Sequence, residues 1–277
     1  MWRKNIDVLI EAALEEDMPE GDITSESIIP PNAISKAFIL AKDKGVLAGI
    51  HVAERVMTKI DRHVIFEIHK RDGESLNMRD EIAALEGRSV SLLKGERTCL
   101  NFLQRMSGIA TTTHAFVKAL KGKKTRILDT RKTTPGLRSL EKYAVRMGGG
   151  MNHRFGLSDM VMIKDNHIKI VGSISKAVHA ARKKAKPGIK IEVETTDKEE
   201  AEEALASGAD IVMLDNMPIE KMKEVMESLS GKVLVEVSGN IQLSKVAEIA
   251  DLGVDFISVG ALTHSYKSLD ISMEFSA

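Results

Sequence analysis

The sequence is poor in cysteine and in aromatic residues, and both shortages exclude classes of protein. Cys99 is the only cysteine among 277 residues, so the chain can form neither an internal disulfide nor a cysteine-rich metal site. Aromatic residues make up 4% of the chain, and no basic stripe is interleaved with stacking side chains, which argues against nucleic-acid binding. We therefore expect a reducing compartment, a small-molecule ligand, and a core position for Cys99.

An excess of one charge and long apolar runs are also lacking. Lys plus Arg and Asp plus Glu number 40 each, so any positive cluster must be local. No apolar run approaches the length of a membrane span, and the opening MWRKNIDVLIEAALEED has no uninterrupted stretch of signal-peptide length. These absences predict a cytoplasmic protein with no membrane partner. The apolar share of 43% is enough for a substantial core.

The first third of the chain predicts an α+β domain over residues 1–108. An amphipathic helix is expected over residues 5–17, and β-rich runs separated by Gly and Asp turns follow over residues 35–93. Only one helix, around residues 51–60, interrupts these runs, so an antiparallel sheet is expected.

A long helical pattern follows over residues 96–121. Gly108 is a candidate break in this helix. Arg97 lies near its expected start, where the helix dipole disfavours a cation, so another group should compensate the charge of Arg97.

From Arg126 onward, short apolar strands alternate with helices. The six expected strands are RILD, MVMIK, IKIEVET, DIVMLD, KVLVEVSG and DFISVG, and polar residues close the last four at intervals of 21 to 23 residues. A complete α/β barrel has eight strands, so we predict an incomplete α/β barrel over residues 109–265, with an open doubly wound sheet as the alternative. The tail, residues 266–277, has a β-like pattern and is predicted to return to the sheet of the first domain.

Cations gather where the first two of these strands end. They are Arg131, Lys132, His153, Arg154 and Lys164. Arg can hold a carboxylate with two parallel hydrogen bonds, whereas Lys acts as a point charge, so the mixture suits a small substrate with several negative groups. A solvated charged face is the plain alternative for any single pair. Because the cations follow apolar strands and glycines lie between them, we favour a binding site.

Carboxylates and glycine turns close the later strands, and with Asp129 and Lys164 they are expected to face one cavity. Glu194 and Asp215 end consecutive strands, where they could hold magnesium on substrate phosphates or accept hydrogen bonds from ribose hydroxyls. The alternative is that both acids only neutralise neighbouring Lys or Arg. The turns Ser238-Gly239-Asn240 and Val259-Gly260-Ala261 precede helix-like sequence, where backbone amides can approach a phosphate.

Several long motifs carry a resemblance to a known family. They are TRKTTPGLRSLEKYAVRMGGGMNHRFGLSDMVMIKDNH, GERTCLNFLQRMSGIATTT before it, and IEVET, MLDN, EVSGN and ISVGALTHS after it. Together they closely resemble the quinolinate phosphoribosyltransferases, the carboxylating nicotinate-nucleotide pyrophosphorylases, over nearly the whole chain. The resemblance implies transfer of ribose 5-phosphate from phosphoribosyl pyrophosphate to the nitrogen of quinolinate, giving nicotinate mononucleotide, pyrophosphate and carbon dioxide in de novo NAD biosynthesis.

The resemblance also implies a fold, an assembly and a cofactor. The fold is an α+β sandwich amino-terminal domain with an incomplete α/β barrel of the type II phosphoribosyltransferase kind. The assembly is a homodimer with shared active sites, and a hexamer built as a trimer of dimers stays open. Mg²⁺ is the implied cofactor.

Site residues follow from the resemblance at matching positions. Quinolinate carboxylates would be bound by Arg131, Lys132, His153, Arg154 and Lys164, and Arg97 would reach into the site of the neighbouring subunit. Glu194 and Asp215 would bind ribose and magnesium, and phosphate would be held by Ser238, Gly239, Asn240 and Gly260. The catalytic groups would be Lys132, Lys164, Glu194 and Asp215.

Three other functions compete with this one. A paralogous barrel associated with molybdenum transport has a similar architecture, although the retained motifs Asn152-His153-Arg154 and Arg131-Lys132 favour quinolinate. Lys164 at a strand end could instead form a Schiff base, as in a barrel aldolase. A non-catalytic anion-binding protein would bind both ligands and release no pyrophosphate.

Overall fold

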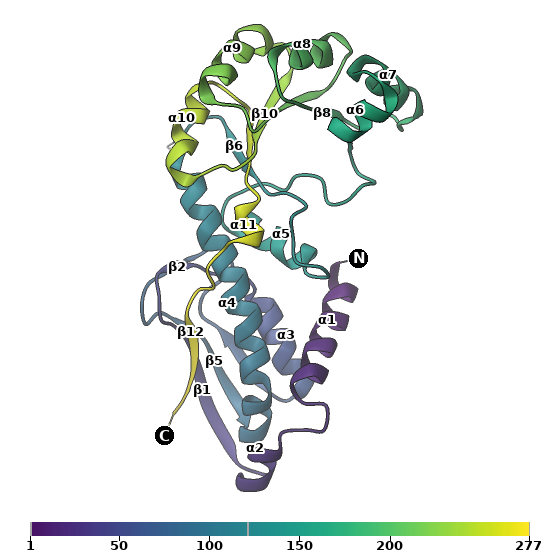
Figure 1. Ribbon diagram of the computed structural model, residues 1–277. Helices are drawn as coiled ribbons and strands as arrows, with labels where there is room; N and C mark the ends of the chain where they lie inside the picture. Colours follow the sequence, from purple (N-terminus) through teal and green to yellow (C-terminus); the bar gives the residue numbers. More distant parts are fainter. Residues whose placement is uncertain (1, 121, 277) are drawn as a thin grey trace. The chain divides into compact units, whose positions relative to one another are not determined.

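The computed structural model describes residues 2–120 and 122–276, which form two compact units (Figure 1). The first unit comprises Met1–His114, Thr134–Gly149 and Tyr266–Ala277, and the second comprises Ala115–Thr133 and Gly150–Ser265. The predicted domain boundary between residues 108 and 109 falls inside one continuous helix and stays a prediction. Over the described residues, no helix combines the length and apolarity needed to cross a membrane.

The first unit contains an antiparallel four-stranded sheet and is of the predicted α+β kind. Its strand order is β12 (Ile271–Phe275), β1 (Ile34–Ala41), β5 (Glu81–Arg88) and β3 (Ile65–Ile68). Ala37, Ile39 and Ala41 are buried on alternate positions of β1, as expected when one face of a sheet covers a core. The tail strand β12 pairs with β1 from Ala37 opposite Phe275 to Ala41 opposite Ile271 (Figure 1).

Short strands and helices complete the first unit. The strands β2 (Gly45–Val46) and β4 (Ser75–Leu76) form a two-stranded sheet. The helices are α1 (Trp2–Asp17), α2 (Ile23–Ile28), α3 (Ile50–Ile60), α5 (Arg138–Met147) and the first part of α4 (Ser89–Ala119). The short helix α2 begins at an Asp22 side chain that accepts the N–H of Ser25.

The long helix α4 differs from its prediction at the start and in the middle. It begins at Ser89, so the expected strand residues 89–93 are helical and Arg97 lies in the third turn. The expected conflict between Arg97 and the helix dipole was therefore wrong, since the dipole effect falls off within the first turn. Gly108 does not interrupt the helix. A Cβ at this position would lie 2.9 Å from the Cα of Ser268, so glycine allows the tail to pack against α4.

Cys99 lies in the apolar core, as the sequence predicted. Its side chain is fully buried on α4, as are those of Leu103 and Ile109. Burial raises the pKa of the Cys99 thiol to about 12, so this sulfur packs as a core group and is not an activated nucleophile.

The second unit is a parallel six-stranded sheet, and all six predicted strands are present. In spatial order they are β6 (Arg126–Leu128), β11 (Phe256–Ser258), β10 (Leu234–Ser238), β9 (Ile211–Asp215), β8 (Ile191–Thr195) and β7 (Val161–Ile163). Residues 211–214 of β9 are buried without alternation, as in a parallel sheet covered on both faces. The six strands confirm the predicted incomplete α/β barrel.

Helices follow the strands in the predicted rhythm. They are α6 (Asp165–Val171), α7 (Ile174–Lys184), α8 (Lys198–Ala206), α9 (Ile219–Leu229), α10 (Val246–Asp251) after the 3-10 turn η1 (Leu243–Lys245), and α11 (Ala261–His264). Side-chain caps set the start of two of them, because Ser173 accepts the N–H of Lys176 and Asp197 accepts that of Glu200. The short helix α6 was not predicted.

The segment that connects β6 to β7 lies beside β6 at Met151. Consecutive in sequence, β6 and β7 form opposite edges of the sheet. Met151 makes a parallel bridge to Leu128, in which its N–H donates to the carbonyl of Ile127 and its carbonyl accepts from Asp129. The segment therefore covers part of the β6 edge and holds residues 152–154 at the carboxyl end of this strand.

Candidate active site

Five predicted site residues come from the carboxyl ends of five strands. Lys164 follows β7, Glu194 lies near the end of β8, Asp215 and Ser238 end β9 and β10, and Gly260 follows β11. Asp215 pairs in register with Ser238. Neighbouring strands are about 4.8 Å apart, so the side chains from β8, β9 and β10 share one rim of the second unit.

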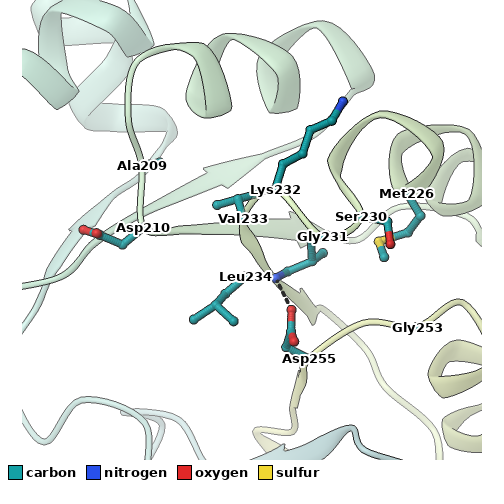
Figure 2. Close-up of a pocket in the computed structure, with 11 residues that line it drawn as sticks. Ala209, Asp210, Met226, Ser230, Gly231, Lys232, Val233, Leu234, Gly253 and Asp255 are labelled. Atoms are coloured by element: carbon teal, nitrogen blue, oxygen red, sulfur yellow. Dashed lines mark hydrogen bonds between the residues drawn. The ribbon is translucent and has the colours of Figure 1, made fainter.

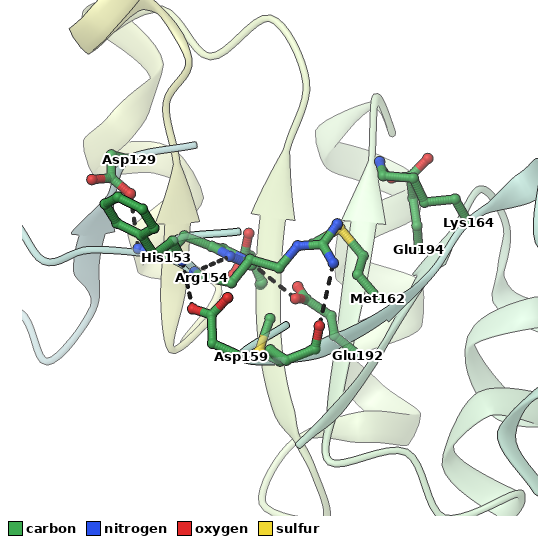
Figure 3. A network of polar contacts seen from close by, with 11 residues as sticks. Asp129, His153, Arg154, Asp159, Met162, Lys164, Glu192 and Glu194 are labelled. Carbon is green, nitrogen blue, oxygen red and sulfur yellow. Dashed lines mark hydrogen bonds and ion pairs between the residues drawn. The ribbon is translucent and has the colours of Figure 1, made fainter. Parts of the chain in front are cut away.

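Lys164 and Glu194 form an ion pair across β7 and β8. The ammonium Nζ donates to Oε2 of Glu194, and the Lys164 side chain is 42% exposed while that of Glu194 is 15% exposed (Figure 3). A carboxylate bound to Nζ suits charge binding and occupies the nitrogen that would have to attack a carbonyl in a Schiff-base reaction. This contact therefore counts against the aldolase alternative.

The turns after β9 and β10 interlock through asparagine side chains. Asn216 donates from Nδ2 to Asp215 at 2.7 Å and from its backbone N–H to the carbonyl of Ser238 at 2.9 Å. Nδ2 of Asn240 donates to Oδ1 of Asn216 at 3.2 Å. Gly239 has a φ of 96°, and a Cβ there would collide with the Asn216 side chain. These contacts bring Asp215, Ser238, Gly239 and Asn240 together, as predicted for neighbouring strand ends.

Asn216 was missed as a site residue by sequence reasoning. It has a φ of 54° and Asn240 has a φ of 47°, a region that asparagine enters more readily than most residues. An asparagine directly after the strand-ending Asp215 was the available signal.

Lys132 lies against Gly260. A Cβ at Gly260 would lie 3.2 Å from Cδ of Lys132 and 3.0 Å from Nε2 of His264. The hydroxyl of Thr263 donates to the Lys132 carbonyl at 2.8 Å. The loop after β6 is thus joined to the loop after β11, and the small residue at position 260 leaves room for the lysine side chain.

Arg131 and Arg154 are close enough to repel each other. Burial, followed by the positive charge of Arg131, lowers the pKa of the Arg154 guanidinium. The guanidinium stays charged and is held by the carbonyl of Met160 at 3.3 Å and by Sδ of Met162 at 3.5 Å. Arg131 is exposed and Arg154 is half-buried. Two neighbouring guanidinium groups of this kind can bind an anion.

His153 faces the interior of the second unit. Its side chain is 6% exposed, and Nε2 lies 3.0 Å from Oε2 of Glu192 (Figure 3). The same nitrogen lies 3.5 Å from Oε2 of Glu236. On the other side of the ring, Nδ1 accepts the N–H of Arg154 at 2.7 Å. Binding of quinolinate by His153 stays a prediction.

Asp129 is buried instead of facing a cavity with the rest of the rim. It is 0% exposed, and its carboxylate accepts the N–H of His153 at 2.8 Å and Nδ2 of Asn152 at 2.6 Å. The prediction that Asp129 faces one cavity with the other strand-end residues was wrong, because residues 152–153 supply hydrogen-bond donors to its buried carboxylate.

Arg97 belongs to the first unit and not to the group assembled by the second. Its side chain is exposed on α4. Its predicted role in the site of a neighbouring subunit stays a prediction.

The donor set at the rim fits Mg²⁺. Glu194 and Asp215 supply two carboxylates from adjacent strands, and Mg²⁺ usually takes one or two carboxylates together with substrate phosphates and water. In the described part of the chain, three metal-ligand atoms approach one another within 4.8 Å in a different group, His153, Glu192 and Glu236. Sequence reasoning missed both of these glutamates.

A cavity of about 520 Å³ lies at the opposite ends of the strands (Figure 2). Its lining includes Asp210, Lys232, Leu234 and Asp255, around the amino ends of β9 and β10. The carboxylate of Asp255 accepts the N–H of Val235 at 2.8 Å there. This cavity therefore lies away from the rim residues.

The fold and the rim define a class of protein, an α/β-barrel enzyme for small anionic substrates. Residues 22–107 match the family model of the quinolinate phosphoribosyl transferase N-terminal domain, and residues 109–274 match that of the C-terminal domain. The chain belongs to the quinolinate phosphoribosyl transferase family.

Individual relatives agree with the family. The chain is 47% identical over 259 residues to the probable carboxylating nicotinate-nucleotide pyrophosphorylase of Bacillus subtilis, covering 94% of this chain and 89% of the relative. The crystal structure of NadC from Streptococcus pyogenes has a TM-score of 0.95 and 45% identity, covering 98% of this chain and 96% of that one. Human nicotinic acid phosphoribosyltransferase shares the fold alone, with a TM-score of 0.66 and 12% identity over 92% and 72% of the chains.

Proposed function

We propose that this chain transfers ribose 5-phosphate from phosphoribosyl pyrophosphate to the ring nitrogen of quinolinate. The 2-carboxylate of the ring leaves as carbon dioxide, and the products are nicotinate mononucleotide and pyrophosphate, a step of de novo NAD biosynthesis. Family membership and the names of close relatives support this reaction. The match of both domains to the family models is the single observation that carries it, and the positive charges of Arg131 and Arg154 suit a dicarboxylate.

Acceptor binding is assigned to the cations after β6 and β7. We assign the two carboxylates of quinolinate to Arg131 and Arg154, with Lys132 and Lys164 adding positive charge nearby. After the ribose is attached, the ring nitrogen is cationic, and loss of the 2-carboxylate as carbon dioxide leaves an electron pair at C2 beside it, which then takes up a proton from water. A positive pocket stabilises this charge and so favours the second step as well as binding.

Donor binding is assigned to the later strands. We assign the ribose hydroxyls to Glu194 and Asp215, and the phosphates to the turns that contain Ser238, Gly239, Asn240 and Gly260, where backbone amides can approach closely. Glu194 and Asp215 would also hold Mg²⁺, directly or through water. The ion would neutralise charge on the departing pyrophosphate.

The catalytic groups act by electrostatics and by position. A transition state with positive charge on the ribose is stabilised by the carboxylates of Glu194 and Asp215, and the leaving pyrophosphate is stabilised by Lys132 and Lys164. Two polyanions repel each other in solution, so holding both in one site removes much of the barrier. The reaction requires no protein nucleophile.

We also propose a homodimer with shared sites. In this assembly Arg97 acts in the site of the partner subunit, and three dimers can combine into a hexamer. The single cysteine supports a reducing compartment such as the cytoplasm.

The test of the reaction is product formation by the purified protein. Phosphoribosyl pyrophosphate and Mg²⁺ are supplied with quinolinate, with nicotinate, or with no acceptor, and nicotinate mononucleotide is measured by chromatography. Product with quinolinate alone is the expected result. Product with nicotinate, or none with any acceptor from folded protein that binds quinolinate, would contradict the proposal.

A further inference from the structure

Two glutamates lie fully buried in the apolar strands of the second unit. Glu192 in β8 and Glu236 in β10 are both 0% exposed. Alternate residues of a strand point to the same face. Glu192 therefore points to the same face as Glu194, two residues further along β8, and Glu236 to the same face as Ser238, two residues further along β10. The four carboxylate oxygens accept no well-aligned hydrogen bond from the residues that the structure describes. A buried carboxylate must be paired, protonated or bound to metal.

The ring of His153 provides a partner and also reveals where its proton lies. The backbone N–H of Arg154 donates to Nδ1 at 2.7 Å, so Nδ1 uses its lone pair and the ring proton sits on Nε2. Nε2 lies 3.0 Å from Oε2 of Glu192 and 3.5 Å from Oε2 of Glu236. These are ion-pair distances, and the contacts lack the alignment of a hydrogen bond.

The same geometry disfavours a metal ion between these side chains, although their ligand atoms lie within 4.8 Å of one another. A histidine that binds a metal gives the lone pair of one nitrogen to the ion and donates the N–H of the other to a protein acceptor. In His153 the outward nitrogen accepts a hydrogen bond, so the inward nitrogen has a proton and no lone pair to offer.

A proton on Glu236 accounts for the remaining charge. Two carboxylates close together in a low-dielectric interior cannot both be ionised. Burial, followed by the charge of Glu192, raises the pKa of Glu236 well above its ordinary value. A protonated Glu236 can donate to Glu192, which then faces two donors, the Glu236 carboxyl and His153 Nε2–H.

Residues 152–154 are held from the opposite side by Asp129. This fully buried carboxylate accepts the His153 backbone N–H at 2.8 Å and the Asn152 side chain at 2.6 Å. Asp129 follows β6, and the two glutamates lie in β8 and β10. Residues 152–154 therefore contact side chains from three strands. The guanidinium of Arg154 extends from this fixed segment to the Met160 carbonyl just before β7.

We propose that Glu192 and Glu236 are a positioning pair that fixes the His153 ring by a shared proton network, so that His153 sets where Arg154 meets the acceptor carboxylate. This inference rests on the proposed function, and it adds Glu192 and Glu236 as residues that act through His153 and Arg154 and touch no substrate. The orientation of Arg154 thus depends on side chains in the interior of the barrel.

The test compares three variants at the buried pair by calorimetric binding of quinolinate and of phosphoribosyl pyrophosphate. Glu236→Gln keeps an N–H donor in place of the protonated carboxyl, and we expect both affinities to stay within about threefold of the unsubstituted protein. Glu236→Leu keeps the volume and removes the donor, and Glu192→Gln replaces the carboxylate that faces both donors. We expect each of these two to weaken quinolinate binding by about tenfold with little change for phosphoribosyl pyrophosphate.

A matched control lies at the other end of the same strand. Asp255 accepts the backbone N–H of Val235 at 2.8 Å at the amino end of β10. Asp255→Asn should lower thermal stability at most and leave the ratio of the two affinities unchanged. Equal weakening of both ligands by Glu192→Gln, or a Glu236→Gln variant as weak as Glu236→Leu, would overturn the inference.

A readout that needs no activity is the nitrogen NMR spectrum of protein with labelled histidine. We expect His153 to show a proton on Nε2 and none on Nδ1, and His153→Gln to remove this signal. A metal bound at unit stoichiometry in the purified protein, lost in Glu236→Gln, would instead show a metal site and overturn the inference. Failure of the unsubstituted protein to bind quinolinate would contradict the proposed function. This outcome is distinguishable from failure of the inference about the buried pair, because the NMR spectrum is recorded without substrate.

Discussion

Nζ of Lys164 is bound to the carboxylate of Glu194 across the neighbouring strands β7 and β8. Each group therefore orients the other at the rim, and the carboxylate that we assign to the donor sugar also positions a cation. The pair connects the two halves of the proposed site, because Lys164 belongs to the acceptor cations and Glu194 to the donor carboxylates.

Removal of the Glu194 charge should slow turnover more than it weakens binding. We expect Glu194→Gln to lower kcat by about a hundredfold, because a carboxylate that stabilises transition-state charge is lost while its shape is kept. Steady-state kinetics with both substrates would measure the effect. Glu202→Gln is the control, since this residue is exposed on α8 and its carboxylate lies 3.9 Å from Nζ of Lys198. A kcat for Glu194→Gln equal to that of this control would rule out the catalytic assignment.

Arg154 should discriminate between the two substrates. We expect Arg154→Ala to weaken quinolinate binding by roughly tenfold to a hundredfold, the effect of losing a hydrogen bond between charged groups, and to change phosphoribosyl pyrophosphate binding far less. Titration calorimetry measures both affinities. Arg182→Ala is the control, because Arg182 pairs with Asp210 on the surface. Equal losses for both ligands would contradict the acceptor role of Arg154.

Arg97 should act in the site of the partner subunit. We expect Arg97→Ala and Lys164→Ala proteins to be inactive alone and to recover activity when mixed, because a hybrid dimer contains one site with neither substitution. Activity is measured after subunit exchange has been shown with differently tagged chains. No recovery despite proven exchange would place Arg97 in the site of its own subunit.

Asp61 should make the folded state sensitive to acid. The backbone N–H of His63, with Arg88 and Ser91, lowers the pKa of this buried carboxyl to about 2. The stabilisation is therefore present above the unfolded pKa near 3.8 and is lost as pH falls towards 2, an effect of about 2 kcal/mol at most.

Urea unfolding would measure this effect of Asp61 at about pH 6, above both pKa values, and at about pH 2.5, between the folded and the unfolded pKa. We expect Asp61→Asn to be less stable than the unsubstituted protein at the higher pH, and the difference in unfolding free energy to shrink at the lower pH. A difference that is the same at both pH values would show that the Asp61 charge contributes nothing.

The six strands of the second unit and the rim at their carboxyl ends could be predicted from the sequence because they depend on local patterns. The alternation of apolar strands with helices identified β6 to β11, and residues at strand ends must meet at one edge of a parallel sheet. The start of α4 at Ser89 could not be predicted in this way, because the alternating pattern of residues 89–93 fits a strand as well as a helix.

The orientation of His153 was also beyond the sequence. Its ring is fixed by Glu192 and Glu236, which lie 39 and 83 residues further along the chain, and by a hydrogen bond from its neighbour Arg154. A signal for the two glutamates was nevertheless present. Each glutamate lies two residues before a rim residue on the same strand, Glu194 or Ser238. It must therefore point to the same face of the strand as that rim residue, into the barrel.

The most direct measurement is the release of carbon dioxide from quinolinate labelled at the 2-carboxylate, recorded together with pyrophosphate release. We predict equal amounts of the two products, formed only when phosphoribosyl pyrophosphate is present. In Arg154→Ala, we predict that both products are lost at low quinolinate concentration. Pyrophosphate release without carbon dioxide, or equal rates with nicotinate as acceptor, would contradict recognition of a dicarboxylate by the Arg131 and Arg154 pair.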